Sequence, residues 1–149
     1  GMEYGTIVPE EAGLYPLDPM TGLSVLAELT RACRAVGVQR DGTPVPPFFV
    51  PLTNPGGPSA AWLKEMFLDH APDFERAPQL REFYDPAQWV FQSASRHGNP
   101  YLPASYEATL ALNSTVKYRQ LAEGDWSVFQ GAFFPEFREA THVLEGVLV

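Results

Sequence analysis

The stretch FFVPLTNPGG, residues 48–57, joins a short apolar run to a turn. Its first five residues predict a buried strand. Pro51 has no backbone N–H to give to a neighbouring strand, which places it at a sheet edge or at a strand end. The four residues 54–57 predict a turn, because proline fixes φ and glycine tolerates positive φ. A helix over about residues 58–69 is predicted to follow, so the stretch links one strand to one helix.

A second predicted strand, residues 4–8, stops at Pro9. A predicted helix begins at Asp18-Pro19, which offers a cap and a first-turn proline, and ends at Gly37. The remaining elements are predicted as a loop at 71–86, a helix at 103–112, and strands at 89–94, 126–137 and 141–149. Asn113-Ser114 is predicted to cap a further helix that ends at Gly124. The pattern predicts an α/β fold with few strands and a mostly helical second half.

The composition limits the classes of function. Hydrophobic residues make up 45% of the 149 residues, which is too much apolar surface for a disordered tail and predicts one globular domain. There are 18 acidic and 10 basic residues, for a net charge of −8, and the basic residues form no dense run. A domain that binds duplex DNA by itself usually has a basic stripe, so this chain is a poor candidate for a main DNA-binding surface. No apolar run approaches the roughly 20 residues of a membrane span, and we expect a soluble, cytoplasmic protein.

The cysteine and histidine content argues against disulfides and structural zinc. Cys33 is the one cysteine, and its spacing from His70, His97 and His142 does not match a zinc site. We expect the histidines at the surface or hydrogen-bonded. The three tryptophans are predicted to anchor the core: Trp62, Trp89 and Trp126.

The adjacent carboxylates Glu10 and Glu11 follow the first predicted strand. In ATPases with a phosphate-binding P-loop, the first acid of such a pair holds Mg²⁺ and the second orients or deprotonates the attacking water. Two solvated acids in a loop are the alternative, since so short a motif often occurs by chance. The 149 residues contain no P-loop motif, because that motif needs a lysine directly after a glycine. The two lysines, Lys64 and Lys117, do not follow a glycine. We therefore expect the isolated chain neither to bind nor to hydrolyse ATP.

Five segments, taken in order, resemble one protein family. They are IVPEEA (residues 7–12), LTNPGG with AWLK (52–57 and 61–64), NPYLP (99–103), EGDW with FFPEF (123–126 and 133–137), and HV (142–143). The series is similar to the large subunit of tailed-phage terminases, the ATP-driven motor that packages DNA into the procapsid. The similarity covers the second half of the ATPase region of that protein, from the acid-pair strand through a helical lid to a linker.

The resemblance implies a division of the chain and roles for four residues. A partial P-loop NTPase-type core would occupy about residues 2–57, a helical lid 58–126, and a linker towards a nuclease domain 127–149. Glu10 would bind Mg²⁺, and Glu11 would be the catalytic glutamate. Thr53 and Asn54 would form the coupling motif, which senses the γ-phosphate and passes hydrolysis on to movement.

The resemblance also implies cofactors and partners. The full-length protein would use ATP and Mg²⁺ in the bacterial host cytoplasm, with double-stranded DNA, the portal protein and the small terminase subunit as partners. The isolated fragment would need no cofactor. Its unpaired strand edges would be protected by a homo-oligomer or by a rearrangement of the first 20 residues.

Two other functions stay open. The chain could be a non-catalytic phage or prophage interaction module that keeps this fold. A small hydrolase that uses Glu10 and Glu11 as an acid–base pair is disfavoured, because adjacent side chains seldom converge on one bond.

Overall fold

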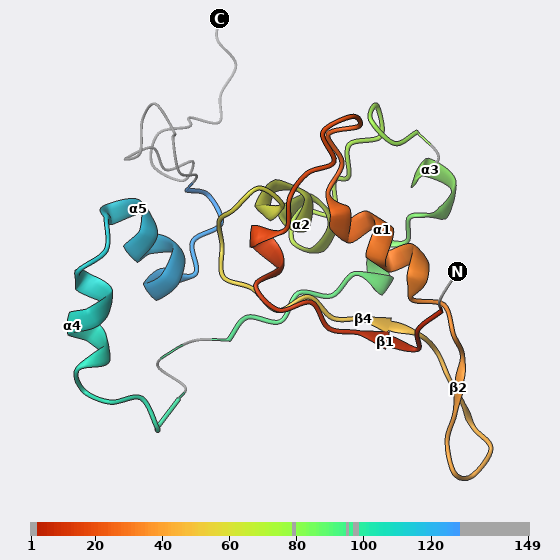
Figure 1. Ribbon diagram of the computed structural model, residues 1–149, viewed down its shortest axis with the longest axis horizontal. Helices are drawn as coiled ribbons and strands as arrows, with labels where there is room; N and C mark the ends of the chain where they lie inside the picture. The colour runs from red at the N-terminus through yellow and green to blue at the C-terminus, as the bar shows by residue number, and fades with distance from the viewer. Residues whose placement is uncertain (1–2, 79, 95, 97–98, 129–149) are drawn as a thin grey trace, which may run out of the picture. The chain divides into compact units, whose positions relative to one another are not determined.

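The computed structural model describes residues 3–78, 80–94, 96 and 99–128, and the chain divides into two compact units, Gly1–Phe91 and Gln92–Val149 (Figure 1). The described part is mixed α/β, with short helices, a parallel pair of strands and an antiparallel pair. This confirms the predicted α/β class at that level. No helix among the described residues is long and apolar enough to cross a membrane.

The parallel pair joins the two predicted N-terminal strands. Strand β1 (Thr6–Ile7) lies beside β4 (Phe48–Phe49), with Thr6 opposite Phe48 and Ile7 opposite Phe49. Both strands lie where the sequence predicts them but are shorter, and β4 ends at Phe49. Exposure alternates along both strands, because neighbouring side chains point to opposite faces.

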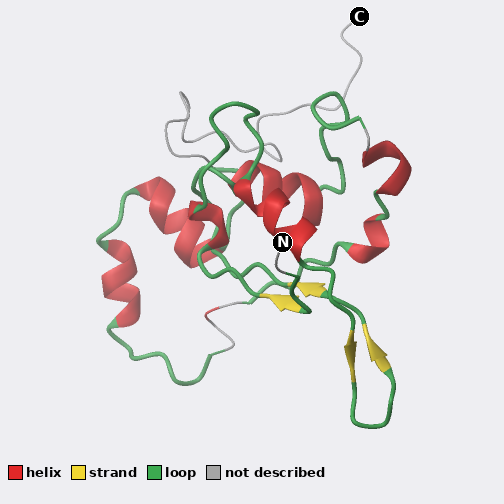
Figure 2. Ribbon diagram, turned by 45° about the vertical axis from the view of Figure 1, so that its right-hand side comes forward, coloured by secondary structure: helices red, strands yellow, loops and turns green. Residues whose placement is uncertain are grey.

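Within the part of the chain that the structure describes, helices cover one face of this pair. The helices α1 (Val25–Ala32) and α2 (Ala60–Phe67) lie on the same side of the strands (Figures 1 and 2). Ile7 and Phe49 are half-buried, whereas Phe48 on the other face is 49% exposed. The prediction of a buried strand at 48–52 is therefore wrong, because every second residue of the run is exposed.

Helix α1 begins later and ends earlier than predicted. The Asp18 carboxylate accepts the N–H groups of Met20 and Thr21 in a local turn, so Asp18 does not cap a helix. Ser24 is the cap instead, and its hydroxyl accepts the N–H of Leu26 at 3.1 Å.

An antiparallel hairpin was missed by the sequence analysis. It pairs β2 (Gly37–Val38) with β3 (Pro44–Val45), and it occupies the place where the helix was predicted to end. Its loop contains the dipeptide Asp41-Gly42, which favours tight hairpin connections because glycine tolerates positive φ. Gly42 has φ 87°. That dipeptide is the signal that could have identified the hairpin.

The segment after α2 contains the clearest wrong prediction. Helix α3 (Leu80–Phe83) and the 3₁₀ turn η2 (Pro86–Gln88) occupy the predicted loop, and residues 89–94 form no strand. The side chain of Trp89 stacks on Tyr84 and packs edge-on against Trp62 and Phe67. These ring contacts, not strand pairing, place the backbone after η2.

Two buried serines join the starts of α1 and α2. Ser24 Oγ lies 2.7 Å from Ser59 Oγ, and Ser59 donates to the carbonyl of Tyr15 at 2.7 Å. Because the only hydroxyl proton of Ser59 goes to Tyr15, Ser24 must donate to Ser59. Both serines are at most 2% exposed, so water cannot replace these bonds. The apolar core around them consists of Ala12, Leu26, Ala60, Leu63 and Met66.

In the unit Gln92–Val149, the described residues form α4 (Tyr106–Ala111), α5 (Thr115–Tyr118) and a π-helical turn, η4 (Arg119–Glu123). The predicted Ser114 cap and Gly124 end are confirmed: Ser114 accepts the N–H of Lys117, and Gly124 has φ 65°. The predicted strand at 141–149 and most of the one at 126–137 lie outside the described residues.

An ion pair closes the end of η4. Arg119 is buried and binds Asp125 at 2.6 Å. Burial alone would raise the pKa of Asp125, but hydrogen bonds from Ser127 and Arg119 outweigh it and hold the pKa below its usual value.

The serine pair can be tested by truncation. We expect Ser24→Ala to lower the free energy of unfolding by about 1–3 kcal/mol, because the N–H of Leu26 loses its acceptor and Ser59 loses a donor. The measurement is urea unfolding followed by tryptophan fluorescence. Ser105→Ala is the matched control, since the Ser105 side chain makes no capping bond, and it should change stability by less than about 0.5 kcal/mol. Equal losses in the two variants would contradict the role of Ser24.

Candidate functional site

The candidate site lies where β1 and β4 end. Backbone hydrogen bonds continue past the ends of the strands. The N–H of Val50 donates to the carbonyl of Ile7, and the N–H of Leu52 donates to the carbonyl of Pro9, each at 2.9 Å. The N–H of Ala12 then returns to the carbonyl of Leu52 at 3.0 Å. The acid pair at 10–11 and the polar pair at 53–54 therefore follow neighbouring parallel strands, at the edge where α/β proteins usually bind ligands.

Two glycines let the backbones of these segments touch. A Cβ on Gly13 would lie 2.3 Å from the carbonyl oxygen of Gly56, and one on Gly57 would lie 2.2 Å from the carbonyl oxygen of Gly13. Gly57 also has φ 90°, a conformation that L side chains rarely adopt. The N–H of Ser59 donates to Gly13 at 3.0 Å, which fixes the start of α2 to the acid-pair turn. Gly13 was not among the predicted site residues, although its place two residues after the acid pair was an available signal.

Thr53 holds the two turns together. Its Oγ1 accepts the N–H of Gly13 at 2.9 Å and donates to the carbonyl of Asn54 at 2.8 Å. The hydroxyl proton is thus already in use, and one oxygen lone pair is left for a ligand. The neighbouring Asn54 is exposed.

Glu11 has an unusual backbone conformation. Its φ of 48° and ψ of 41° place it in the left-handed region, where it precedes the short 3₁₀ helix η1 (Ala12–Leu14) without a side-chain capping bond. For a residue other than glycine this region costs about 1–2 kcal/mol. Such strain often occurs at functional sites, where it fixes the direction of a side chain.

The two carboxylates are available to a cation. Glu10 and Glu11 are both exposed, and within the described part of the chain neither forms an ion pair. No group of three or more His, Cys, Asp or Glu among the described residues is placed to hold a metal by itself. Mg²⁺ often takes only one or two carboxylates and completes its shell with water and substrate phosphates, so the donors present fit that ion.

Comparisons of the chain with protein-family models, with curated proteins and with solved structures find no match. The functional interpretation therefore depends on the residues of the chain and their geometry.

The glycine contact predicts a steric effect. Gly13→Ala should destabilise the unit by about 1–3 kcal/mol or more, because the new methyl group would overlap the backbone of Gly56. Gly37→Ala is the control, since a Cβ there would meet its nearest atom at an ordinary 3.6 Å. Thermal unfolding of both variants provides the comparison, and a tolerated alanine at residue 13 would show that the two turns do not touch.

The strain at Glu11 predicts a gain of stability. Glu11→Gly should stabilise the fold by about 0.5–1 kcal/mol, because the relief of strain exceeds the extra chain entropy of glycine. Glu10→Gly, at a neighbouring exposed residue without positive φ, should give no gain. Chemical denaturation of both variants measures the difference, and a loss of stability in Glu11→Gly would show that the backbone there is unstrained.

Proposed function

We propose that the chain supplies part of the ATPase site of a tailed-phage terminase large subunit. In this function Mg-ATP is the substrate, double-stranded DNA is moved, and the portal protein and the small terminase subunit are the partners. A phosphate-binding loop has to come from a segment outside these 149 residues, which contain no Gly-Lys-Ser/Thr sequence.

The observation that carries the proposal is the adjacency of the two polar turns. A metal-binding acid, a water-activating acid and a γ-phosphate sensor can act on one phosphate only if they lie within a few ångströms of it. Residues 10–11 and 53–54 are more than 40 positions apart in sequence, yet they follow paired parallel strands and share the bond from Gly13 to Thr53. A random pair of surface loops would not need two glycines in backbone contact.

The proposed roles follow from exposure and chemistry. Glu10, an exposed carboxylate with no ion pair to another described residue, would hold the Mg²⁺ that neutralises phosphate charge. Glu11, held in one direction by its backbone, would orient and deprotonate the attacking water. The Asn54 side chain would respond to the γ-phosphate. The Thr53 hydroxyl bonds to the backbone carbonyl of Asn54, and the same turn leads through Ser59 into α2. A change at the phosphate would therefore move that helix.

The roles of Glu11 and Asn54 can be separated in the full-length protein. Glu11→Gln should leave ATP affinity unchanged and lower turnover at least about 10²-fold, because the amide keeps the shape but cannot accept the proton. Asn54→Ala should keep ATP turnover but lose DNA translocation. Glu75→Gln, at an exposed acid in the segment after α2, is the control and should change neither rate. Near-normal turnover in Glu11→Gln would show that the acid pair lies in a solvated loop and has no catalytic role.

One observation favours a second candidate, an interaction module without catalysis. Parallel sheets are normally covered on both faces, whereas no described residue outside the pair covers the outer face of β1 and β4. Its apolar side chains are between 42% and 50% exposed: Val8, Phe48, Val50 and Leu52. In either function this face would be covered by another protein segment. For the interaction module that contact would be the whole function, whereas the ATPase would also need its catalytic residues.

The open face predicts self-association of the isolated chain. Light scattering across a concentration series should show a dimer or larger species, and Val50→Lys should shift the chain to a monomer by placing a charge on that face. Val38→Lys is the control, because Val38 is 70% exposed on the hairpin and away from this face. A wild-type chain that stays monomeric at all concentrations would contradict self-association.

A further inference from the structure

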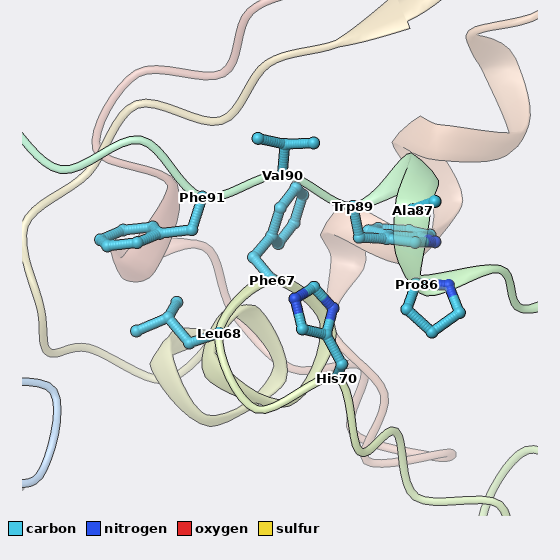
Figure 3. A pocket seen from close by; sticks show the side chains of 8 residues that line it. All are labelled: Phe67, Leu68, His70, Pro86, Ala87, Trp89, Val90 and Phe91. Atoms are coloured by element: carbon cyan, nitrogen blue, oxygen red, sulfur yellow. The ribbon is translucent and has the colours of Figure 1, made fainter.

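A second candidate site lies in the unit Gly1–Phe91, and neither acid of the pair lines it. A cavity of about 540 Å³ opens between the end of α2 and the segment from η2 to Phe91. Its walls include Phe67, Trp89 and Phe91, and His70 is the one ionisable side chain among its eight lining residues (Figure 3). The cavity is shallow and open to solvent, and Val90 and Phe91 among its lining residues are 73% and 44% exposed.

The aromatic wall is held in place by ring contacts. Trp89 packs edge-on against Phe67, with ring centroids 5.1 Å apart, and against Trp62 at 6.2 Å. On another side it stacks on Tyr84 at 5.8 Å with an interplanar angle of 30°. Three partners fix the indole ring, so a ligand would meet a preformed aromatic surface and would lose little affinity in ordering it.

The hydrogen-bond partners of His70 set its tautomer. The Tyr84 hydroxyl donates its only proton to the carbonyl of Met66 at 2.8 Å. At the 3.2 Å contact with His70 Nδ1, the Tyr84 oxygen must therefore accept, and Nδ1 carries the hydrogen. In the neutral ring, Nε2 is then an acceptor. Figure 3 shows the imidazole between Phe67 and Pro86, with one ring nitrogen turned to the side of Leu68 and Phe91.

The backbone keeps His70 in this position. His70 has φ 51°, in the left-handed region that a histidine adopts at a cost. Backbone hydrogen bonds on both sides of His70 hold the turn. The N–H of Asp69 donates to the carbonyl of Lys64 at 2.9 Å, and the N–H of Ala71 donates to the carbonyl of Glu65 at 3.0 Å. An acceptor nitrogen is thus presented from a fixed turn beside an aromatic wall.

We propose that this cavity binds a neutral, flat, fused-ring heteroaromatic molecule that carries one N–H or O–H donor. The rings would pack on Trp89 and Phe67, and the donor would bond to His70 Nε2. No lining residue carries a fixed charge, and the chain has a net charge of −8, so a neutral ligand is favoured over an anion. The proposal is independent of the terminase function, since it uses none of residues 10, 11, 53 or 54.

A pair of probes tests the proposal directly: indole, which has an N–H donor, and 1-methylindole, which has the same rings without it. We expect both to bind saturably to the whole chain in isothermal titration, with 1-methylindole weaker by about 3–10-fold, as one hydrogen bond implies. The Trp89 indole N–H signal in NMR should shift with the same dissociation constants.

Variants assign the effect to the named residues. His70→Phe should bind 1-methylindole normally and lose the preference for indole, and Trp89→Ala should lose both ligands. Trp89→Phe, which retains an aromatic wall, should keep the preference and covers the case in which Trp89→Ala unfolds. Met20→Ala, at a side chain that is 93% exposed, is the control and should bind like the wild type.

Four results would overturn the proposal. They are no saturable binding of either probe, equal affinity for both, tighter binding of indole-3-acetate than of indole, and binding of a tryptophan-containing peptide without binding of indole. The last would identify the cavity as a protein-docking surface. None of these results changes the expected ATPase behaviour of Glu11→Gln or Asn54→Ala.

Discussion

The backbone contact between Gly13 and Gly57 is the constraint on which the rest of the unit Gly1–Phe91 depends. It sets the distance between the turns that follow β1 and β4, and no side chain larger than hydrogen fits at either residue. Ser59 connects this contact to the helices, because its N–H bonds to Gly13 and its hydroxyl joins the pair with Ser24. The positions of α1, α2 and the candidate site are therefore linked through a few buried bonds.

Local signals in the sequence predicted the elements that depend on local chemistry. The Ser114 cap, the end at Gly124 and helix α2 were predicted correctly, because caps and apolar periodicity act within one or two turns of chain. Competing contacts explain the failures. Asp18 accepts hydrogen bonds in a local turn instead of capping a helix. Trp89 packs against the neighbouring Tyr84 and against Trp62 and Phe67, and the last two contacts join rings more than 20 positions apart in the sequence.

The candidate site was only partly predictable. The residue types at 10–11 and 53–54 suggested chemistry, but their spacing in the sequence did not place them together; that expectation came from the resemblance alone. The parallel register of β1 and β4 and the clamp from Thr53 to Gly13 are what bring the two turns side by side. The aromatic cavity was not predicted, because the tryptophans were interpreted as core anchors and His70 as a surface residue. His70 is indeed exposed and hydrogen-bonded, but the structure places it in a cavity wall.

Amide hydrogen exchange, resolved by NMR, tests most directly whether the two turns form one site. The N–H groups of Ala12, Gly13 and Ser59 each bond across the contact, so we expect protection on the order of 100-fold or more over an unstructured peptide. In Thr53→Val, protection at Gly13 should fall selectively, because its acceptor is Thr53 Oγ1. Exchange of these three amides at the unstructured rate in the wild-type chain would show that the turns are separate and would contradict the account.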